Sequence, residues 1–147
     1  MHATPYLVLY HKQRTSARLR FLRHAHGGIC SDGPIAADAR VEVGGGDMPE
    51  SAGAGATLRT HPGMLLRAAE AALGLPRGCI EADGGFRCRV VVDGDHADVH
   101  LAHFSDIDPP LGAAAAAGAE FIDLTAARGL PRPELELLRL AYEHVLG

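Results

Sequence analysis

The stretch "RCRVVVDGDHADVHLAHF", residues 87–104, decides more of the fold than any other part of the chain. Its centre, Asp93-Gly94, is a dipeptide that favours a two-residue type I′ turn between antiparallel strands. With this turn, Arg89 faces Asp98, and successive side chains alternate between the two faces of a hairpin. We therefore predict strands at 86–92 and 96–104. One face would carry Phe86, Cys88, Val90, Ala97, Val99 and Leu101, and the other Arg87, Arg89, His96, Asp98 and His100.

The histidines of this hairpin have two interpretations. His96, Asp98 and His100 alternate on the polar face, as side chains in contact with water do, and Asp98 has Arg89 as its cross-strand partner. A His-x-Asp-x-His pattern on a strand also directs three metal-ligating side chains the same way. Two neighbouring arginines are unfavourable next to a divalent cation, so we predict a solvent-exposed face with no metal and no cofactor.

His103 differs from the other histidines because period two places it on the apolar face with Val99 and Leu101. It stands where the strand ends and the acidic segment "FSDIDPP" begins. One interpretation is a core histidine that is hydrogen-bonded to backbone or to a carboxylate. The other is a functional group held at a strand end, with Ser105, Asp106 or Asp108 orienting or neutralising its ring.

Outside the hairpin, apolar periodicity and helix-end signals predict the other elements. "RTSARLRFLRHAH" (14–26) favours a helix, although the alternation of Arg18, Leu19, Arg20 and Phe21 also suits a second strand. Helix 60–76 would bury Met64, Leu65, Ala68, Ala72 and Leu75, and helix 131–147 would bury Leu135, Leu138, Ala141, Tyr142 and Val145. The further expected strands are 5–10, 39–43, 79–82 and 120–125, with a short helix within 109–119.

This order of elements indicates an α+β fold. We predict one domain, residues 1–147, forming a two-layer sandwich with the helices packed on one face of a mixed or mainly antiparallel sheet. Residues 44–59, "GGGDMPESAGAGATLR", show no apolar periodicity and are expected to form a flexible surface loop. They lack the Gly-Lys-Ser/Thr signature that follows the glycines of a phosphate-binding P-loop.

Composition and charge limit the classes of function. The chain has 147 residues, 47% hydrophobic and 22% charged, three cysteines in no paired spacing, and no signal-peptide or membrane-span pattern, so we expect a soluble cytoplasmic protein. Its net charge is −4, which is unlike a dedicated nucleic-acid reader. Residues 1–31 nevertheless contain no acid, and their basic residues favour a small anion site: Lys12, Arg14, Arg18, Arg20 and Arg23.

The segment "RHAHGGIC" (23–30) has histidines near a possible helix end, and within "LRFLRHAHG" it resembles the Arg-His opening of the histidine phosphatase superfamily. In that family the histidine is phosphorylated and an arginine holds the phosphate. The resemblance places these roles on His24 and Arg23, a second arginine on Arg67 in "HPGMLLRAAEAAL", and a second histidine on His103 in "VHLAHF". The sequence departs from the family at Ala102, where a glycine is usual, and in having a strand before the first motif.

Two classes of function therefore stay open. The first is a module that binds a small anionic ligand or a protein partner, without specific nucleic-acid or membrane binding. The second is a small hydrolase or phosphoryl-transfer enzyme, with His24 and His103 as catalytic residues. In either class we expect Arg23, Arg67 and Asp106 to contact the ligand. The two classes differ in whether Arg23, His24, Arg67 and His103 converge in one pocket.

Overall fold

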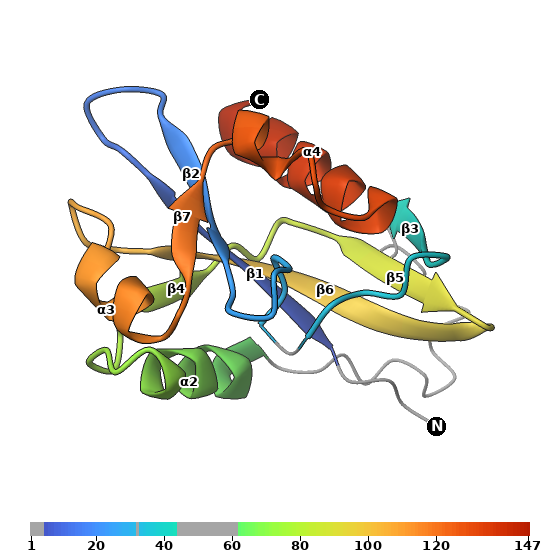
Figure 1. The fold of residues 1–147 in the computed structure, drawn as a ribbon, viewed down its shortest axis with the longest axis horizontal. Coiled ribbons are helices and arrows are strands. Elements are labelled where there is room, and N and C mark those ends of the chain that lie inside the picture. The colour runs from blue at the N-terminus through green and yellow to red at the C-terminus, as the bar shows by residue number, and fades with distance from the viewer. Residues whose placement is uncertain (1–4, 32, 44–61) are drawn as a thin grey trace.

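The computed structural model describes residues 5–31, 33–43 and 62–147 (Figure 1). Within them, three α-helices and a seven-stranded mixed sheet form an α+β fold. The strand order is β3-β5-β6-β1-β2-β7, and β4 pairs with β6 beside β5. The strands are β1 (Tyr6–Lys12), β2 (Leu19–Arg23), β3 (Arg40–Val43), β4 (Ile80–Ala82), β5 (Cys88–Val92), β6 (Asp95–Phe104) and β7 (Glu120–Ile122). The helices are α2 (Pro62–Ala72), α3 (Leu111–Ala116) and α4 (Arg132–Leu146), with a 3₁₀ helix η2 (Leu124–Ala127).

The hairpin β5–β6 has the predicted register. Arg89 lies opposite Asp98, and Val92 opposite Asp95. The turn has positive φ at both central positions, 52° at Asp93 and 83° at Gly94, as a type I′ turn requires. The predicted apolar face is buried, with Phe86, Cys88, Val90, Ala97, Val99 and Leu101 each 7% exposed or less.

The predicted helix at 14–26 is wrong, and the alternative second strand is correct. Residues 19–23 form β2, which pairs antiparallel with β1, with Tyr10 opposite Phe21. Leu19 and Phe21 are two residues apart and buried on one face, at 5% and 0% exposure, and Leu22 is buried on the other face, at 0%. Strand β1 lies between β2 and β6 and runs parallel to β6, placing Tyr10 opposite His103.

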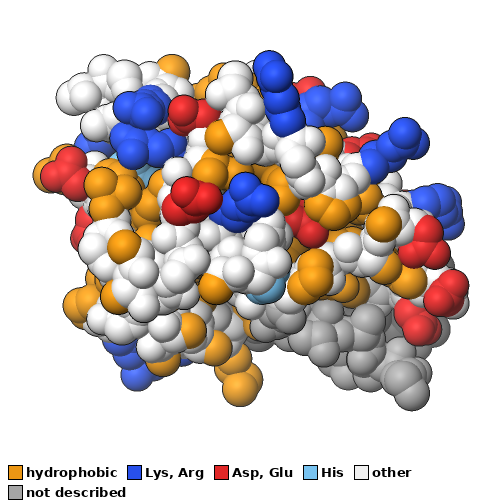
Figure 2. Space-filling view, viewed as in Figure 1, with side chains coloured by type: hydrophobic (Ala, Val, Ile, Leu, Met, Phe, Trp, Pro, Cys, Tyr) orange, Lys and Arg blue, Asp and Glu red, His pale blue; other side chains and the backbone are white. Residues whose placement is uncertain are grey.

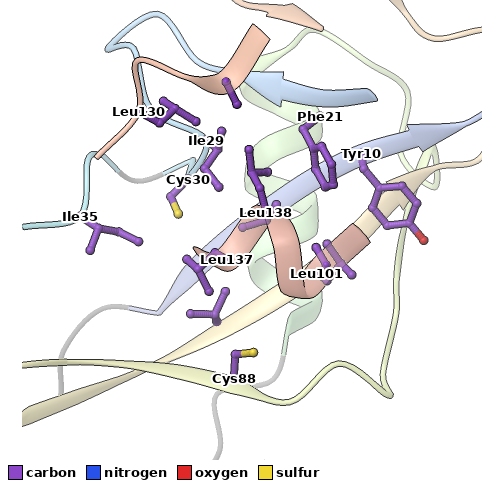
Figure 3. Packing of buried hydrophobic residues seen from close by; sticks show 14 of the residues in the cluster. Tyr10, Phe21, Ile29, Cys30, Ile35, Cys88, Leu101, Leu130, Leu137 and Leu138 are labelled. Atoms are coloured by element: carbon purple, nitrogen blue, oxygen red, sulfur yellow. The ribbon is translucent and has the colours of Figure 1, made fainter. Parts of the chain in front are cut away.

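The helices cover both faces of the sheet, which corrects the predicted two-layer arrangement (Figure 1). Alternate residues of β1 belong to two separate hydrophobic clusters. Val8 and Tyr10 belong to the first cluster, and Leu7 and Leu9 belong to the second. Leu137, Leu138 and Ala141 of α4 belong to the first cluster, part of which is drawn in Figure 3. The second cluster contains Leu66, Ala69 and Leu73 from the α2 segment and Ala114 of α3. With apolar side chains on both faces, β1 could not be stable against a single helical layer.

Two predicted helices are present, but their buried faces differ from the predicted stripes. Helix α4 buries Leu137 and the predicted Leu138 and Ala141, whereas Tyr142 is 37% exposed. Helix α2 buries Leu66, Ala69 and Glu70, whereas Met64 is 82% exposed. Both helices bury a glutamate, Glu70 in α2 and Glu134 in α4, at 2% and 0% exposure, and this polar content hid the true faces.

The remaining predictions are met in part. The short helix expected within 109–119 is α3, and the strand expected at 120–125 is β7 followed at once by η2. The glycine-rich segment 44–59 lies outside the described residues, as do Thr60 and His61 before α2. Across the described part of the chain, no helix combines the length and apolar character that crossing a bilayer demands.

Candidate functional site

His103 belongs to a hydrogen-bonded cluster with Tyr10 and Asp83. The Nδ1–H of His103 donates to Oδ1 of Asp83 at 2.7 Å. The hydroxyl of Tyr10 donates to the other carboxylate oxygen of Asp83, and the Tyr10 and His103 rings lie 5.7 Å apart between centroids. On the outer side, Nε2 of His103 is 3.5 Å from Oε1 of Glu81. In Figure 3 the Tyr10 hydroxyl points away from the hydrophobic cluster that its ring adjoins.

The register of three strands brings these side chains together. Tyr10 of β1 and Glu81 of β4 both lie opposite His103 of β6. Asp83 follows β4 directly, and its backbone N–H donates to the carbonyl of Leu101 at 2.8 Å, which keeps it beside β6. Residues 73 positions apart, Tyr10 and Asp83, therefore meet only after the central strands have paired.

The last turn of α4 closes one side of this cluster. The ring of His144 packs edge-on against Phe86 with centroids 5.6 Å apart. A Cβ atom added at Gly85 would lie 3.3 Å from Cε1 of His144, so the turn that carries Asp83 touches this ring closely. Two imidazoles, His103 and His144, thus approach the same carboxylate from different elements.

The electrostatics of the cluster favour an ionised Asp83. The hydrogen bond to Asp83 outweighs burial and raises the pKa of His103 above its usual value. Burial acts to raise the pKa of Asp83, but the hydrogen bonds from His103 and Tyr10 prevail and lower it. Burial, together with the bond to Asp83, raises the pKa of Tyr10. Tyr10 therefore stays protonated as a donor, and both oxygens of Asp83 are occupied.

This arrangement leaves one side of the His103 ring available. Asp83 fixes the tautomer that carries hydrogen on Nδ1, so Nε2 accepts a proton or, once protonated, donates a hydrogen bond. The side chain of His103 is 31% exposed, and that of Glu81 is 61% exposed. The cluster thus resembles neither a sealed core contact nor an isolated surface histidine, and it can exchange a proton with a ligand or with water.

The partners expected for His103 lie elsewhere. Asp83 and Glu81 contact it, whereas the hydroxyl of Ser105 donates to the carbonyl of Cys79 at 3.2 Å. Asp106 is exposed, and its backbone carbonyl accepts from Nε2 of the buried His11 at 3.0 Å. The segment after β6 is therefore held by His11, which was not among the predicted site residues.

His24 and Arg23 form a separate structure at the end of β2. Nε of Arg23 donates to the carbonyl of Gly27 at 2.9 Å, which closes the turn. The His24 ring stacks on His26 with centroids 5.6 Å apart. Burial, with a smaller contribution from His26, lowers the pKa of His24 to about 4. His24 is thus a neutral, part-buried ring at neutral pH, packed beside its neighbour.

Arg67 is used inside the fold. Its guanidinium contacts both carboxylate oxygens of Glu70, with Nε 2.8 Å from Oε1 and Nη2 3.1 Å from Oε2. Glu70 also accepts from the backbone N–H groups of Gly78 and Ile80, each at 2.9 Å. This ion pair fastens α2 to the start of β4 on the face of the sheet opposite His103.

The candidate residues therefore occupy different places. His24 follows β2 three residues beyond Phe21, which lies opposite Tyr10, whereas His103 lies opposite Tyr10 on the other side of β1. This puts His24 about 10 Å along the strands and about 10 Å across them from His103. His96, Asp98 and His100 lie on the other face of β6 from Val99 and Leu101, apart from both His24 and the His103 cluster. Among residues 5–31, 33–43 and 62–147, no group of three or more His, Cys, Asp or Glu is arranged to hold a metal ion.

His103 was predicted from the sequence as a candidate residue, whereas Tyr10, Glu81 and Asp83 were not. The predicted strands 79–82 and 96–104 carried a usable signal, because pairing them antiparallel places acids near His103. Nothing in the local pattern of either strand specifies that pairing. A scan of the chain against protein-family models found no match, and a search of curated proteins found no similar sequence.

Proposed function

We propose that the protein is a binding module for a small anionic ligand, and that protonated His103 contacts that ligand. The observation that carries the proposal is the hydrogen bond between Nδ1 of His103 and Asp83, which orients the ring and leaves Nε2 beside the exposed carboxylate of Glu81. A protonated imidazole held in this way donates a charge-assisted hydrogen bond to an anionic oxygen. Lys12 lies two residues beyond Tyr10 on β1, is exposed, and adds a positive charge on the same side of the strand.

Glu81 is the group that a ligand has to displace. Its carboxylate stands 3.5 Å from Nε2 of His103, and its side chain is 61% exposed, so it moves at small cost. An anion then takes the place of one exposed carboxylate rather than entering beside it. Arg23 and Arg67 do not serve this site, because their guanidinium groups are bonded within other parts of the fold.

The test is anion binding followed by NMR, with inorganic phosphate and sulfate as probes. We expect His103→Gln to abolish the shifts of residues around Tyr10 and Asp83. Glu81→Gln should strengthen binding about two- to fivefold, the size of an exposed ion-pair term. The matched control is His96→Gln, an exposed histidine of the same strand that should bind as the wild type does. Equal binding by the His103 and His96 variants would overturn the proposal.

A hydrolase is the second candidate, and the same Asp83–His103 contact favours it, because a carboxylate that orients a histidine supports general-base chemistry. The phosphatase form needs His24 and His103 in one pocket, and their positions in the strand register speak against it. The assay is turnover of p-nitrophenyl phosphate and p-nitrophenyl acetate. Turnover abolished by both His103→Gln and Asp83→Asn, without phosphorylation of His24, would favour the general-base hydrolase over the binding module.

A further inference from the structure

A second site lies at the other end of the same sheet face, where the segment 34–36 passes over the β5–β6 hairpin. The cavity there has a volume of about 440 Å³. This is within the usual range of small-ligand pockets, about 300–1,000 Å³. Ala97 is six residues from His103 along β6, which corresponds to about 20 Å at the rise of a strand. The site is therefore independent of the cluster around His103.

The cavity, which we call the hairpin slot, has apolar walls and an acidic rim. Among the described residues that line it, the charged ones are Asp93 and Asp95, and no Lys, Arg or His of this described set is present. The residues that line it are Tyr6, Pro34, Ile35, Ala36, Val90, Val92, Asp93, Asp95 and Ala97. Figure 2 shows acidic side chains at the right-hand end of this face, over the β5–β6 turn, beside hydrophobic ones.

The positions of these residues follow from the register of the hairpin. Val90, Val92, Asp95 and Ala97 share one face, because Val90 pairs with Ala97 and Val92 with Asp95. This face is apolar toward β1 and becomes acidic only at the turn. A ligand on the floor of the slot therefore meets hydrophobic side chains first and carboxylates at one end.

The outer wall of the slot is held in place by a buried carboxylate. Glu134 of α4 is 0% exposed, and its two oxygens accept from the N–H groups of Ile29 at 2.9 Å and Ile35 at 3.3 Å. These bonds connect the segment that carries Pro34 and Ile35 to α4. The wall is thus positioned before any ligand arrives, which reduces the ordering cost of binding.

From this geometry we infer that the hairpin slot binds a small hydrophobic amine, with the apolar part on Val90 and Ala97 and the ammonium group at Asp93 and Asp95. The apolar floor supplies the area that drives binding. The carboxylates select the charge, since they attract an ammonium and repel a carboxylate. The aromatic ring of Tyr6 in the wall adds a surface that favours a cation.

The experiment compares three probes of similar shape by NMR titration: 2-phenylethylamine, 2-phenylethanol and phenylacetate. The amine should shift Ile35, Val92 and Ala97, and the alcohol should bind about two- to fivefold more weakly, as expected for loss of an exposed ion pair. Phenylacetate should bind most weakly. Added salt should reduce the preference for the amine, because the rim charges are exposed.

Variants separate the charge from the apolar floor. Asp95→Asn should lower amine affinity toward that of the alcohol and leave the alcohol unchanged. The matched control Asp108→Asn, an exposed aspartate outside the slot, should leave both unchanged. Ala97→Leu should weaken both probes by filling the floor, provided that its spectrum stays folded. Equal affinity for the three probes, shifts centred on His103, or self-association through this face would each overturn the inference.

Discussion

A single proton on His103 links the candidate site to the stability of the fold. His103 has a raised pKa in the folded protein, so its contribution is full below the unfolded value and declines as pH rises through the folded pKa. Asp83 has a lowered pKa, so its contribution is full above its unfolded value and declines at more acidic pH. The pair is therefore most stabilising between about pH 4 and pH 6.5, the ordinary values for Asp and His.

The corresponding prediction concerns His103→Gln. Its loss of unfolding free energy should be largest near pH 5–6, at about 1.5–3 kcal/mol, the range for a hydrogen bond to a charged group. The loss should shrink at alkaline pH, where only the neutral imidazole hydrogen bond with Asp83 is left. Denaturant unfolding at several pH values measures it, with His96→Gln as the exposed control. A loss that grows with pH would contradict the assignment of the proton.

Gly28 provides a second residue-scale prediction. A Cβ atom at this position would lie 2.9 Å from both Oε1 of Glu134 and Cε1 of His26. The carboxylate cannot retreat easily, because the N–H groups of Ile29 and Ile35 hold its oxygens. We expect Gly28→Ala to destabilise the protein by about 1–3 kcal/mol, the range for overpacking. Thermal unfolding measures this effect, and Gly129→Ala, where nothing lies within 4 Å, should be close to neutral.

Helix α4 was predicted correctly as an element, but its predicted buried face is partly wrong. Leu137 is fully buried, at 0% exposure, although the predicted stripe omitted it and included the exposed Tyr142. Leu137→Ala should cost about 2–5 kcal/mol, as expected for a leucine in a packed core. Tyr142→Ala should cost much less, because its ring already contacts water. Denaturant midpoints of the two variants decide the question, and equal losses would favour the predicted stripe.

Sequence alone could predict the elements whose pattern is local. The hairpin β5–β6 was predictable in its register, since Asp93-Gly94 specifies the turn and alternation specifies the faces. The segment 14–26 was ambiguous, because its helix-end signals competed with the strand-like alternation of Leu19 and Phe21. Its strand form depends on pairing with β1, which is a contact between elements. Glu70 and Glu134 are buried although they are charged residues. The buried faces of α2 and α4 therefore could not be recognised from apolar residues alone.

The candidate site was predictable only at one residue. His103 stood out because it continues an apolar face at a strand end. Tyr10 looked like one of several apolar residues in β1, and Asp83 looked like part of a polar turn. Their place beside His103 arises from the pairing of β1 and β4 with β6. Such pairings join distant segments, and no local periodicity encodes them.

The whole molecule has one sheet between two hydrophobic clusters. Each residue step along β1 changes cluster, with Val8 in the first and Leu9 in the second. Both clusters therefore contain side chains of β1, so the loss of packing in one cluster destabilises a strand that also contributes to the other. On the surface, basic side chains lie mainly over the upper half of the face in Figure 2, near β2 and α4.

We predict that the two clusters unfold together. Leu138→Ala in the first cluster and Leu66→Ala in the second should each lower the midpoint of a single transition. The two changes should add within about 0.5 kcal/mol, because the side chains lie on opposite faces and share no contact. Far-ultraviolet circular dichroism and tyrosine fluorescence should report the same midpoint. Two separate transitions in either variant would contradict a shared unfolding unit.

The parallel pairing of β1 with β6 has a consequence for synthesis on the ribosome. The partners of Tyr6 to Tyr10 are Val99 to His103, which are translated roughly 90 residues later. At about 5–20 residues per second, β1 waits about 5–20 seconds for this neighbour. During that interval the nascent chain can form the β1–β2 hairpin, but one edge of its most apolar strand stays open. β1 thus lacks its neighbour β6 throughout this interval, and chaperones that shield apolar strands would act in this window.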